Sequence, residues 1–156
     1  MKHNLVILAA LFLAFPAGAE AGDMEDIVAA IEKRWTDTAK KQINPGDSNP
    51  AGSWLATSQG GLWQFQSPAE AVAMITDSPN TLAFQPMHIN VQIMGSQKDV
   101  AYATYYLVGN IMIEGKPLVS NYRTRASTVY VKIGGKWLTS GEHYSPLYGG
   151  SGVVFD

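Results

Sequence analysis

The stretch RASTVYVKIGGKWLTSGEHYS, residues 125–145, decides the fold. Two runs rich in β-branched and aromatic residues flank Gly134-Gly135. Such runs on either side of a two-residue glycine turn are typical of paired antiparallel strands. The stretch therefore predicts a β-hairpin at the end of the domain.

Three similar segments precede the second strand of this hairpin. Alternation with a period of two predicts strands over 82–95, 99–113, 117–133 and 136–145, separated by short turns that contain glycine. Consecutive strands joined by short turns pair side by side, so we expect an antiparallel meander. Strands this long curl, and the sheet is expected to be curved.

Two helices are predicted before the sheet. Asp23 is expected to cap the first, because apolar residues follow at helical spacing: Ile27, Val28, Ile31, Trp35 and Ala39. The second begins at Ser67-Pro68, where Glu70 completes a capping box. Residues 52–67 between them are expected to be irregular or a short strand. Helices followed by a curved sheet predict an α+β fold, shaped as a cone that the helices close on one side.

The first residues have the pattern of an export signal. Lys2 precedes an unbroken apolar run over 5–15, then Pro16 and a small-residue segment that ends at Ala21. The run has 11 residues, whereas a membrane span needs about 20. We therefore predict a cleavable signal peptide over 1–21 and a single domain over 22–156, periplasmic or secreted and without a membrane anchor after cleavage.

Composition excludes several kinds of chemistry. The net charge of −2 offers no basic footprint for nucleic acid, and the chain has no cysteine for a disulfide, a thiol nucleophile or an iron–sulfur cluster. After the predicted cleavage, His88 and His143 are the only histidines, too few for an ordinary catalytic zinc site. The sequence predicts neither a metal nor a cofactor.

The hairpin also resembles a known family. Arg125-x-Ser127, an apolar strand, the glycine turn closed by Trp137, and then His143-x-Ser145 are similar to the final hairpin of SnoaL-like domains, in the nuclear transport factor 2-like superfamily. The order of helices and strands matches as well. The resemblance implies a cone-shaped fold with an internal pocket and a homodimer formed through the outer face of the sheet. It implies no single function, because such domains include isomerases, dehydratases, cyclases and oligomerisation modules.

The register of the hairpin decides which side chains share the pocket. With a two-residue turn, Ala126 lies opposite His143, which then shares a face with Tyr122. With a three-residue turn, Arg125 lies opposite His143, and the resemblance favours this arrangement because it places both inside. A slip of one residue exchanges the two faces.

Arg125 and Arg123 project from one face, two residues apart, and could receive an anion inside the pocket. The alternative places both at the surface. His143 could act as a general base, with Tyr122 or another tyrosine holding an oxyanion, or it could be purely structural. An isomerase needs a carboxylate inside the pocket as a proton shuttle, but Asp99 and Glu114 lie in turns and Asp37 lies off the apolar stripe of the first helix. Only Glu142 is on a strand, and the sequence does not decide which face of the sheet it occupies.

These observations favour an exported small-molecule-binding protein with a pocket for a partly apolar ligand, anionic if Arg125 anchors it. The residues expected at this ligand are Arg125, Arg123, Trp54, Trp63, Tyr102 and Ser145. The second hypothesis is a cofactor-independent isomerase, dehydratase or cyclase with His143 as base. The third is a homo-oligomeric interaction module whose cavity is filled by its own side chains.

Overall fold

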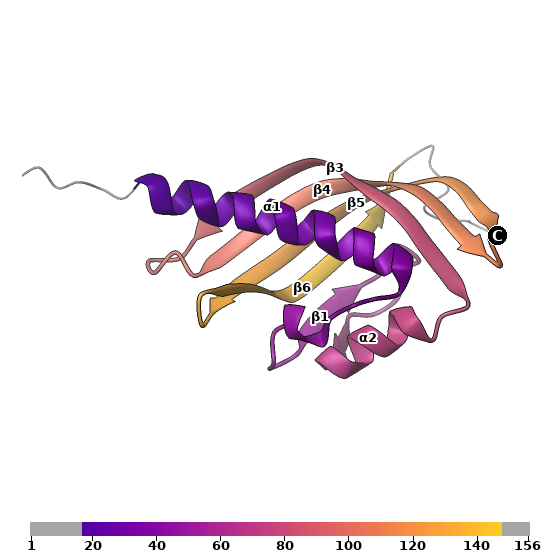
Figure 1. Cartoon of the computed structure of the whole chain (residues 1–156), viewed down its shortest axis with the longest axis horizontal. Coiled ribbons are helices and arrows are strands. Elements are labelled where there is room, and N and C mark those ends of the chain that lie inside the picture. Colours follow the sequence, from indigo (N-terminus) through magenta and orange to yellow (C-terminus); the bar gives the residue numbers. More distant parts are fainter. Residues whose placement is uncertain (1–16, 148–156) are drawn as a thin grey trace, which may run out of the picture.

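The computed structural model describes residues 17–147, with side chains from Gly22 onward, and confirms the α+β class. In chain order the elements are α1 (Ala17–Lys40), the 3-10 turn η1 (Pro45–Asp47), β1 (Ser53–Ala56), β2 (Gln64–Gln66), α2 (Pro68–Thr76), β3 (Asn80–Met94), β4 (Val100–Ile113), β5 (Lys116–Ile133) and β6 (Lys136–Pro146) (Figure 1). Residues 1–16 of the expected signal peptide lie outside the described residues, so the leader stays a prediction. No helix in the described range is long and apolar enough to span a membrane.

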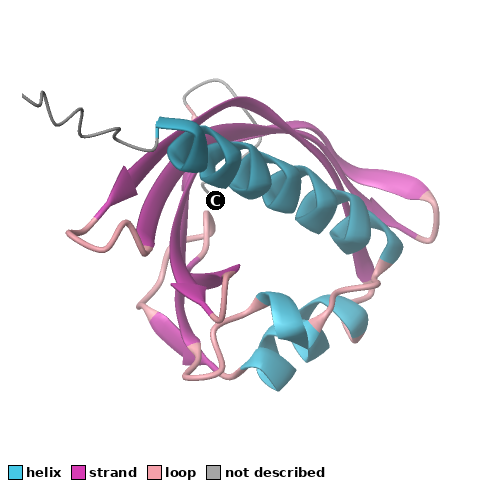
Figure 2. Ribbon diagram, turned by 60° about the vertical axis from the view of Figure 1, so that its left-hand side comes forward, coloured by secondary structure: helices cyan, strands magenta, loops and turns pink. Residues whose placement is uncertain are grey.

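Helix α1 lies across the concave side of the sheet and buries its predicted stripe there (Figure 2). Ile27 and Ile31 are fully buried and Trp35 is 6% exposed. The expected cap at Asp23 is wrong, because the small residues before it extend the helix back to Ala17. The Asp23 carboxylate instead accepts hydrogen bonds from Lys132 Nζ and from Trp137 Nε1 at 3.2 Å, tying α1 to the last hairpin.

The segment between the helices forms two short strands. β1 pairs antiparallel with β2 and parallel with β6, so the sheet is mixed at this end. The predicted start of α2 is confirmed. Ser67 Oγ accepts from the Glu70 amide at 3.3 Å, and Glu70 Oε2 accepts from the Ser67 amide at 2.7 Å. This reciprocal pair satisfies backbone donors that the first helical turn would otherwise leave free.

The four predicted long strands form the expected antiparallel meander, and the full sheet has the order β2-β1-β6-β5-β4-β3. The sheet arches over α1, while α2 lies below it near the β1–β2 end (Figure 2). Gly109 of β4 is required where β3 and β4 approach closely. A Cβ at this position would lie 2.1 Å from the Ala83 carbonyl oxygen.

The two faces of the sheet are sharply different. The inner face, toward α1, carries the core residues of β4 and β5: Ala101, Ala103, Tyr105, Leu107, Tyr122, Ala126 and Tyr130. The outer face carries the alternate residues, among them Tyr102, Tyr106, Arg123 and Arg125. Aromatic packing joins helix to sheet, since Phe84 packs on Trp35 at 5.6 Å and stacks on Tyr122 at 4.8 Å between ring centroids.

Candidate functional site

A cavity of about 240 Å³ lies between α1, α2, the segment after β1 and the inner face of the sheet. Its walls are mainly apolar and aromatic, with Trp35, Leu55, Met74, Ile75, Leu82, Phe84 and Leu107 among the lining residues. Polar residues also line it: Arg34, Thr38, Thr57, Ser58, Gln59, Ser78, Asn80, Tyr122, Thr124, Glu142 and Tyr144. An apolar hollow with convergent polar groups is the usual form of a small-molecule site.

The only opposite charges that line this cavity are paired. Arg34 Nη2 donates to Glu142 Oε2 at 2.7 Å, and the two side chains are 16% and 2% exposed. Tyr144 OH donates to the other carboxylate oxygen, Glu142 Oε1, at 2.8 Å. The three side chains come from α1 and β6, so the cluster fixes the helix against the last strand.

Burial sets the protonation of the partners of Glu142. Burial by itself would lower the pKa of Arg34, but the Glu142 carboxylate and the neighbouring tyrosines reverse this and raise it. Burial raises the pKa of Tyr144 well above its usual value, and the adjacent carboxylate adds to the effect. Arg34 therefore stays a cation and Tyr144 stays a neutral hydrogen-bond donor.

A second polar position lies on the cavity wall at Tyr122. Its hydroxyl is hydrogen-bonded to Ser58 Oγ from the segment after β1, and its ring stacks on Phe84. Tyr122 is 7% exposed and Ser58 is 8% exposed. Tyr122 thus lines the internal cavity, while its role in catalysis stays a prediction.

The hairpin register differs from both alternatives considered from the sequence. The glycine turn has two residues, with Ile133 opposite Lys136, but Ser140 then interrupts the ladder as an extra residue in β6. Beyond it Glu142 lies opposite Thr128, and His143 lies opposite Ser127. The interruption occurs where Asn49 docks, since its amide donates to the Thr139 carbonyl at 2.8 Å and its Nδ2 to Ser140 Oγ at 3.1 Å.

This extra residue corrects the predicted site. Arg125 and His143 do share a face, as the resemblance implied, but that face is the outer one. Both side chains are exposed, and Arg123, Tyr102 and Ser145 lie on the same side of the sheet. The expectation that these residues line the internal cavity is wrong. Arg123, Arg125 and Tyr102 alternate with the buried residues of β4 and β5 and so face outward. His143 and Ser145 face outward because they follow the β6 bulge, which exchanges the two faces.

The two tryptophans expected at the pocket are also on the outside. Trp54 is 52% exposed and packs edge-on against Phe65, with ring centroids 5.4 Å apart. Trp63 is 56% exposed and lies 5.8 Å from the His143 ring. They belong to the short strands and loop at the β2 end of the sheet, and neither lines the cavity.

Arg34 and Glu142 were missed as a site by the sequence reasoning. A signal existed for Arg34, because it stands three residues after Ile31 and next to Trp35, on the edge of the buried stripe. Glu142 was recognised as the only carboxylate on a strand, but its face could not be assigned without the bulge. The structure thus supplies the cavity carboxylate whose absence argued against proton-transfer chemistry.

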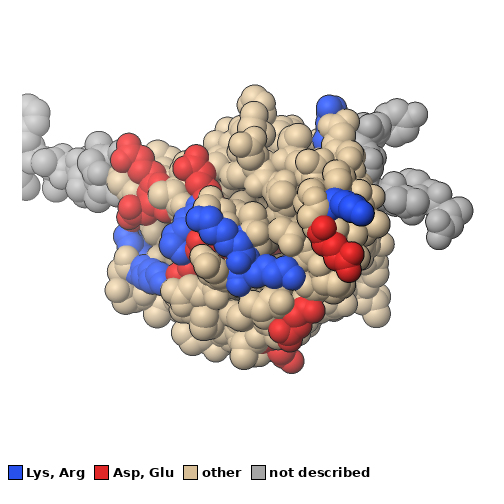
Figure 3. All heavy atoms as spheres, turned by 45° about the vertical axis from the view of Figure 1, so that its right-hand side comes forward, with Lys and Arg blue, Asp and Glu red and all other residues tan. Residues whose placement is uncertain are grey.

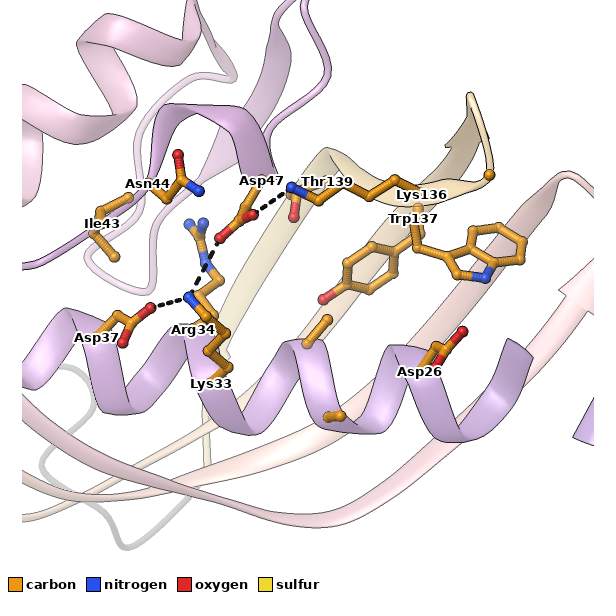
Figure 4. A pocket seen from close by; sticks show the side chains of 14 residues that line it. Asp26, Lys33, Arg34, Asp37, Ile43, Asn44, Asp47, Lys136, Trp137 and Thr139 are labelled. Atoms are coloured by element: carbon orange, nitrogen blue, oxygen red, sulfur yellow. Dashed lines mark hydrogen bonds and ion pairs between the residues drawn. The ribbon is translucent and has the colours of Figure 1, made fainter. Parts of the chain in front are cut away.

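A separate surface cleft of about 540 Å³ lies between α1, the η1 segment and the start of β6 (Figure 4). Ion pairs cross it: Lys33 pairs with Asp37 and, at 3.7 Å, with Asp47, which also accepts from Lys136 at 2.8 Å. Arg34 lines this cleft as well as the internal cavity. One face of the molecule accordingly shows basic side chains with acidic ones beside them, not a patch of one sign (Figure 3). The part of the chain with described side chains contains no cluster of three or more histidine and acidic residues suited to a metal.

No protein-family model matches the sequence, and no curated protein matches it significantly. Solved structures do match. An aromatic ring hydroxylase candidate from Novosphingobium aromaticivorans superposes with a TM-score of 0.66 at 13% identity. The match covers 81% of this chain and 90% of the other. A candidate dehydratase of the nuclear transport factor 2-like family from Streptomyces avermitilis gives 0.61 at 20% identity, over 81% and 97%. The association domain of C. elegans CaMKII gives 0.59 at 16% identity, over 81% and 98%.

These similarities span most of each chain at identities that establish architecture alone. They agree with the curved sheet and the crossing helix described above. The chain therefore has the nuclear transport factor 2-like fold.

Proposed function

We propose that this chain is an exported small-molecule-binding protein whose ligand occupies the internal cavity. The observation that carries the proposal is the buried Arg34–Glu142 pair at the wall of the hollow. A buried ion pair adds little to stability compared with apolar packing of the same volume. Its position at a cavity, with Tyr144 alongside, instead suits recognition of a polar group on a ligand.

The lining suggests the chemistry of the ligand. Arg34 and Glu142 cancel each other in charge, so a neutral ligand avoids both desolvating a net charge and repelling one partner. The guanidinium retains donors beyond the one bonded to Glu142, and Glu142 can accept a further donor. A volume of about 240 Å³ corresponds to roughly eight water molecules, enough for a molecule of about one ring. The expected ligand is therefore a small, partly aromatic molecule with a carbonyl or hydroxyl group.

Three probes of nearly equal shape test this chemistry: benzamide, benzoate and benzylamine. We expect benzamide to bind best in titration calorimetry, because benzoate would face Glu142 and benzylamine would face Arg34. Tyr122→Phe removes one hydroxyl from the cavity wall, and Tyr102→Phe removes one from the outer face. Benzamide binding should weaken only in the first variant. Equal affinities in both variants, or no binding of any probe, would contradict the proposal.

A second candidate is a proton-transfer enzyme, such as an isomerase or dehydratase, that uses Glu142. It is favoured by the presence of a carboxylate and of tyrosine hydroxyls at one cavity. It comes second because both carboxylate oxygens already accept hydrogen bonds within the protein. Deuterium uptake next to the carbonyl of cyclohexanone, lost in Glu142→Gln, would support it. His143 could serve as a base only on the outer face.

We also propose pairing with a second copy through the outer face. Large apolar side chains are exposed there, including Trp54, Tyr102 and Tyr106, and such surfaces usually meet a partner. Similar structures include association and hub domains of a calmodulin-dependent kinase. Sedimentation should give a dimer that Tyr106→Glu dissociates. A monomer at all concentrations would contradict the pairing. An interaction module whose cavity is filled by its own side chains is disfavoured, because a hollow of about 240 Å³ remains in the interior.

Export rests on the leader pattern alone. Expression with the native leader in a bacterial host should release a protein whose N-terminal sequence begins at Gly22, or at Glu20 if the peptidase cuts after Ala19. A product that retains Met1 in the cytoplasm would contradict export.

A further inference from the structure

The outer face contains a second hollow, of about 500 Å³, that the internal cavity does not share. Strand register explains its shape. Asn90, Thr104, Ser127 and His143 form one row across β3, β4, β5 and β6. The short side chains of Thr104 and Ser127 occupy the middle of this row. Longer ones, Tyr102 on one side and Tyr106 with Arg125 on the other, stand in the neighbouring rows about 6.7 Å away. We call this hollow the outer groove.

The groove carries positive charge and hydrogen-bond donors. Arg125 lies opposite Ser145, and His143 lies opposite Ser127, so Arg125 and His143 are diagonal neighbours. Diagonal positions are about 7–8 Å apart, which long side chains span. Serine, threonine and tyrosine hydroxyls complete the lining, which contains no carboxylate among the residues that the structure describes.

Arg125 has little to satisfy it within the protein. Among the described residues, its guanidinium makes one hydrogen bond, from Nη2 to the Pro146 carbonyl oxygen, at the long distance of 3.5 Å. Arg123, two residues away on the same face, lies outside the groove lining and donates from Nε to Asn121 Oδ1 at 3.0 Å. The two arginines therefore differ: only Arg125 faces the groove with most of its donors open.

The far wall of the groove is built with local strain. His88 has a φ of 52°, a left-handed backbone conformation that residues other than glycine rarely adopt. It lies where the register of β3 shifts against β4. This bulge brings His88 to the groove, edge-on to Tyr106, with ring centroids 6.0 Å apart. An imidazole is thus positioned across the groove from the side that His143 occupies.

We propose that the outer groove binds a small oxyanion, a carboxylate or a phosphate, gripped by Arg125 with help from His143. The guanidinium offers two parallel N–H donors that match such an anion, and no carboxylate among the described lining residues competes for them. The site is separate from the internal cavity, since the two hollows share no lining residue. If two copies pair through this face, the anion would also neutralise cations that pairing brings together.

The test is titration with inorganic phosphate, and separately with succinate, at constant ionic strength maintained with sodium chloride. Amide and imidazole NMR shifts of residues at the groove report binding. We expect saturable shifts around Arg125 and His143, an affinity at least about tenfold lower in Arg125→Gln, and a partial loss in Arg125→Lys, which keeps the charge without the fork. Arg123→Gln is the matched control and should change the affinity less than twofold.

Unchanged thermal midpoints of the variants will show that the exposed substitutions leave the fold intact. Binding that weakens equally in Arg123→Gln and Arg125→Gln would overturn the proposal, because the effect would then be general charge screening. Shifts that never saturate would overturn it as well. So would a dimer, found by sedimentation, that closes the groove and takes up neither phosphate nor succinate.

Discussion

The buried pair of Arg34 and Glu142 gives the sharpest test of how α1 is held to the sheet. Arg34→Met would remove the cation and leave a carboxylate that is 2% exposed and accepts a hydrogen bond from the Tyr144 hydroxyl. Breaking a buried pair in this way costs about 3–5 kcal/mol, because an uncompensated charge remains. Glu142→Gln should cost less, about 2 kcal/mol, since Arg34 is 16% exposed and lines the cleft, where water can reach it.

The double variant, Arg34→Met with Glu142→Gln, removes both charges while nearly conserving volume. We expect it to cost about 1–2 kcal/mol, less than Arg34→Met alone, which gives a coupling energy of about 3–6 kcal/mol. Urea unfolding measures all three free energies. With a slope of about 2 kcal/mol per molar, Arg34→Met should lower the midpoint by about 1.5–2.5 M.

Lys33→Met is the matched control, because it removes the neighbouring cation of α1. Lys33 pairs with Asp37 and Asp47 but is 59% exposed, so solvent screens both pairs and its loss should cost far less than the loss of Arg34. The reasoning fails if Arg34→Met costs no more than Lys33→Met. It fails equally if the double variant costs the sum of the two single ones.

Three further outcomes follow from local geometry. Gly109→Ala should cost about 1–3 kcal/mol in urea unfolding, since its Cβ would meet the Ala83 carbonyl oxygen at 2.1 Å, whereas Gly22→Ala, with nothing within 4 Å, should cost nothing. Ser67→Ala should cost about 1 kcal/mol through loss of the α2 capping box, and a thermal midpoint equal to that of the parent would contradict this. Burial raises the pKa of Tyr105, Tyr130 and Tyr144, so their stabilising contribution is complete below the unfolded value of 10.0 and declines as pH rises above it. Ultraviolet titration should show these tyrosines ionising together with unfolding, and simultaneous ionisation of all tyrosines near pH 10 in a folded chain would refute it.

Local chemistry made much of the fold predictable from the sequence. The period-two segments and their glycine turns gave the meander, and Ser67-Pro68 with Glu70 gave the start of α2, because these signals act between residues close in the chain. The parallel pairing of β1 with β6 had no such signal. It joins Trp54 to Gly141, residues far apart in sequence, through packing that only the folded chain creates.

The candidate site was harder to predict because the face that each residue of β6 occupies depends on whether it lies an odd or an even number of residues from the glycine turn. Counting from the glycine turn assigns faces correctly for Lys136 to Thr139, and Asn49 then interrupts the count by docking at Ser140. Exposure misled in a second way. Trp54 and Trp63 are large and apolar, which favours burial, yet they lie at the outer surface, where a partner or ligand can cover them.

The extra residue at Ser140 makes the character of the cavity depend on chain length as much as on side-chain identity. Deleting one residue there, with the turn and β5 unchanged, would rotate the end of β6 by half a strand repeat. His143 would then face α1 and Glu142 would face outward, so an acidic interior would become an imidazole one without a single substitution. A fold of this kind can therefore exchange its internal chemistry by insertion or deletion, a route that comparison of aligned residues alone would overlook.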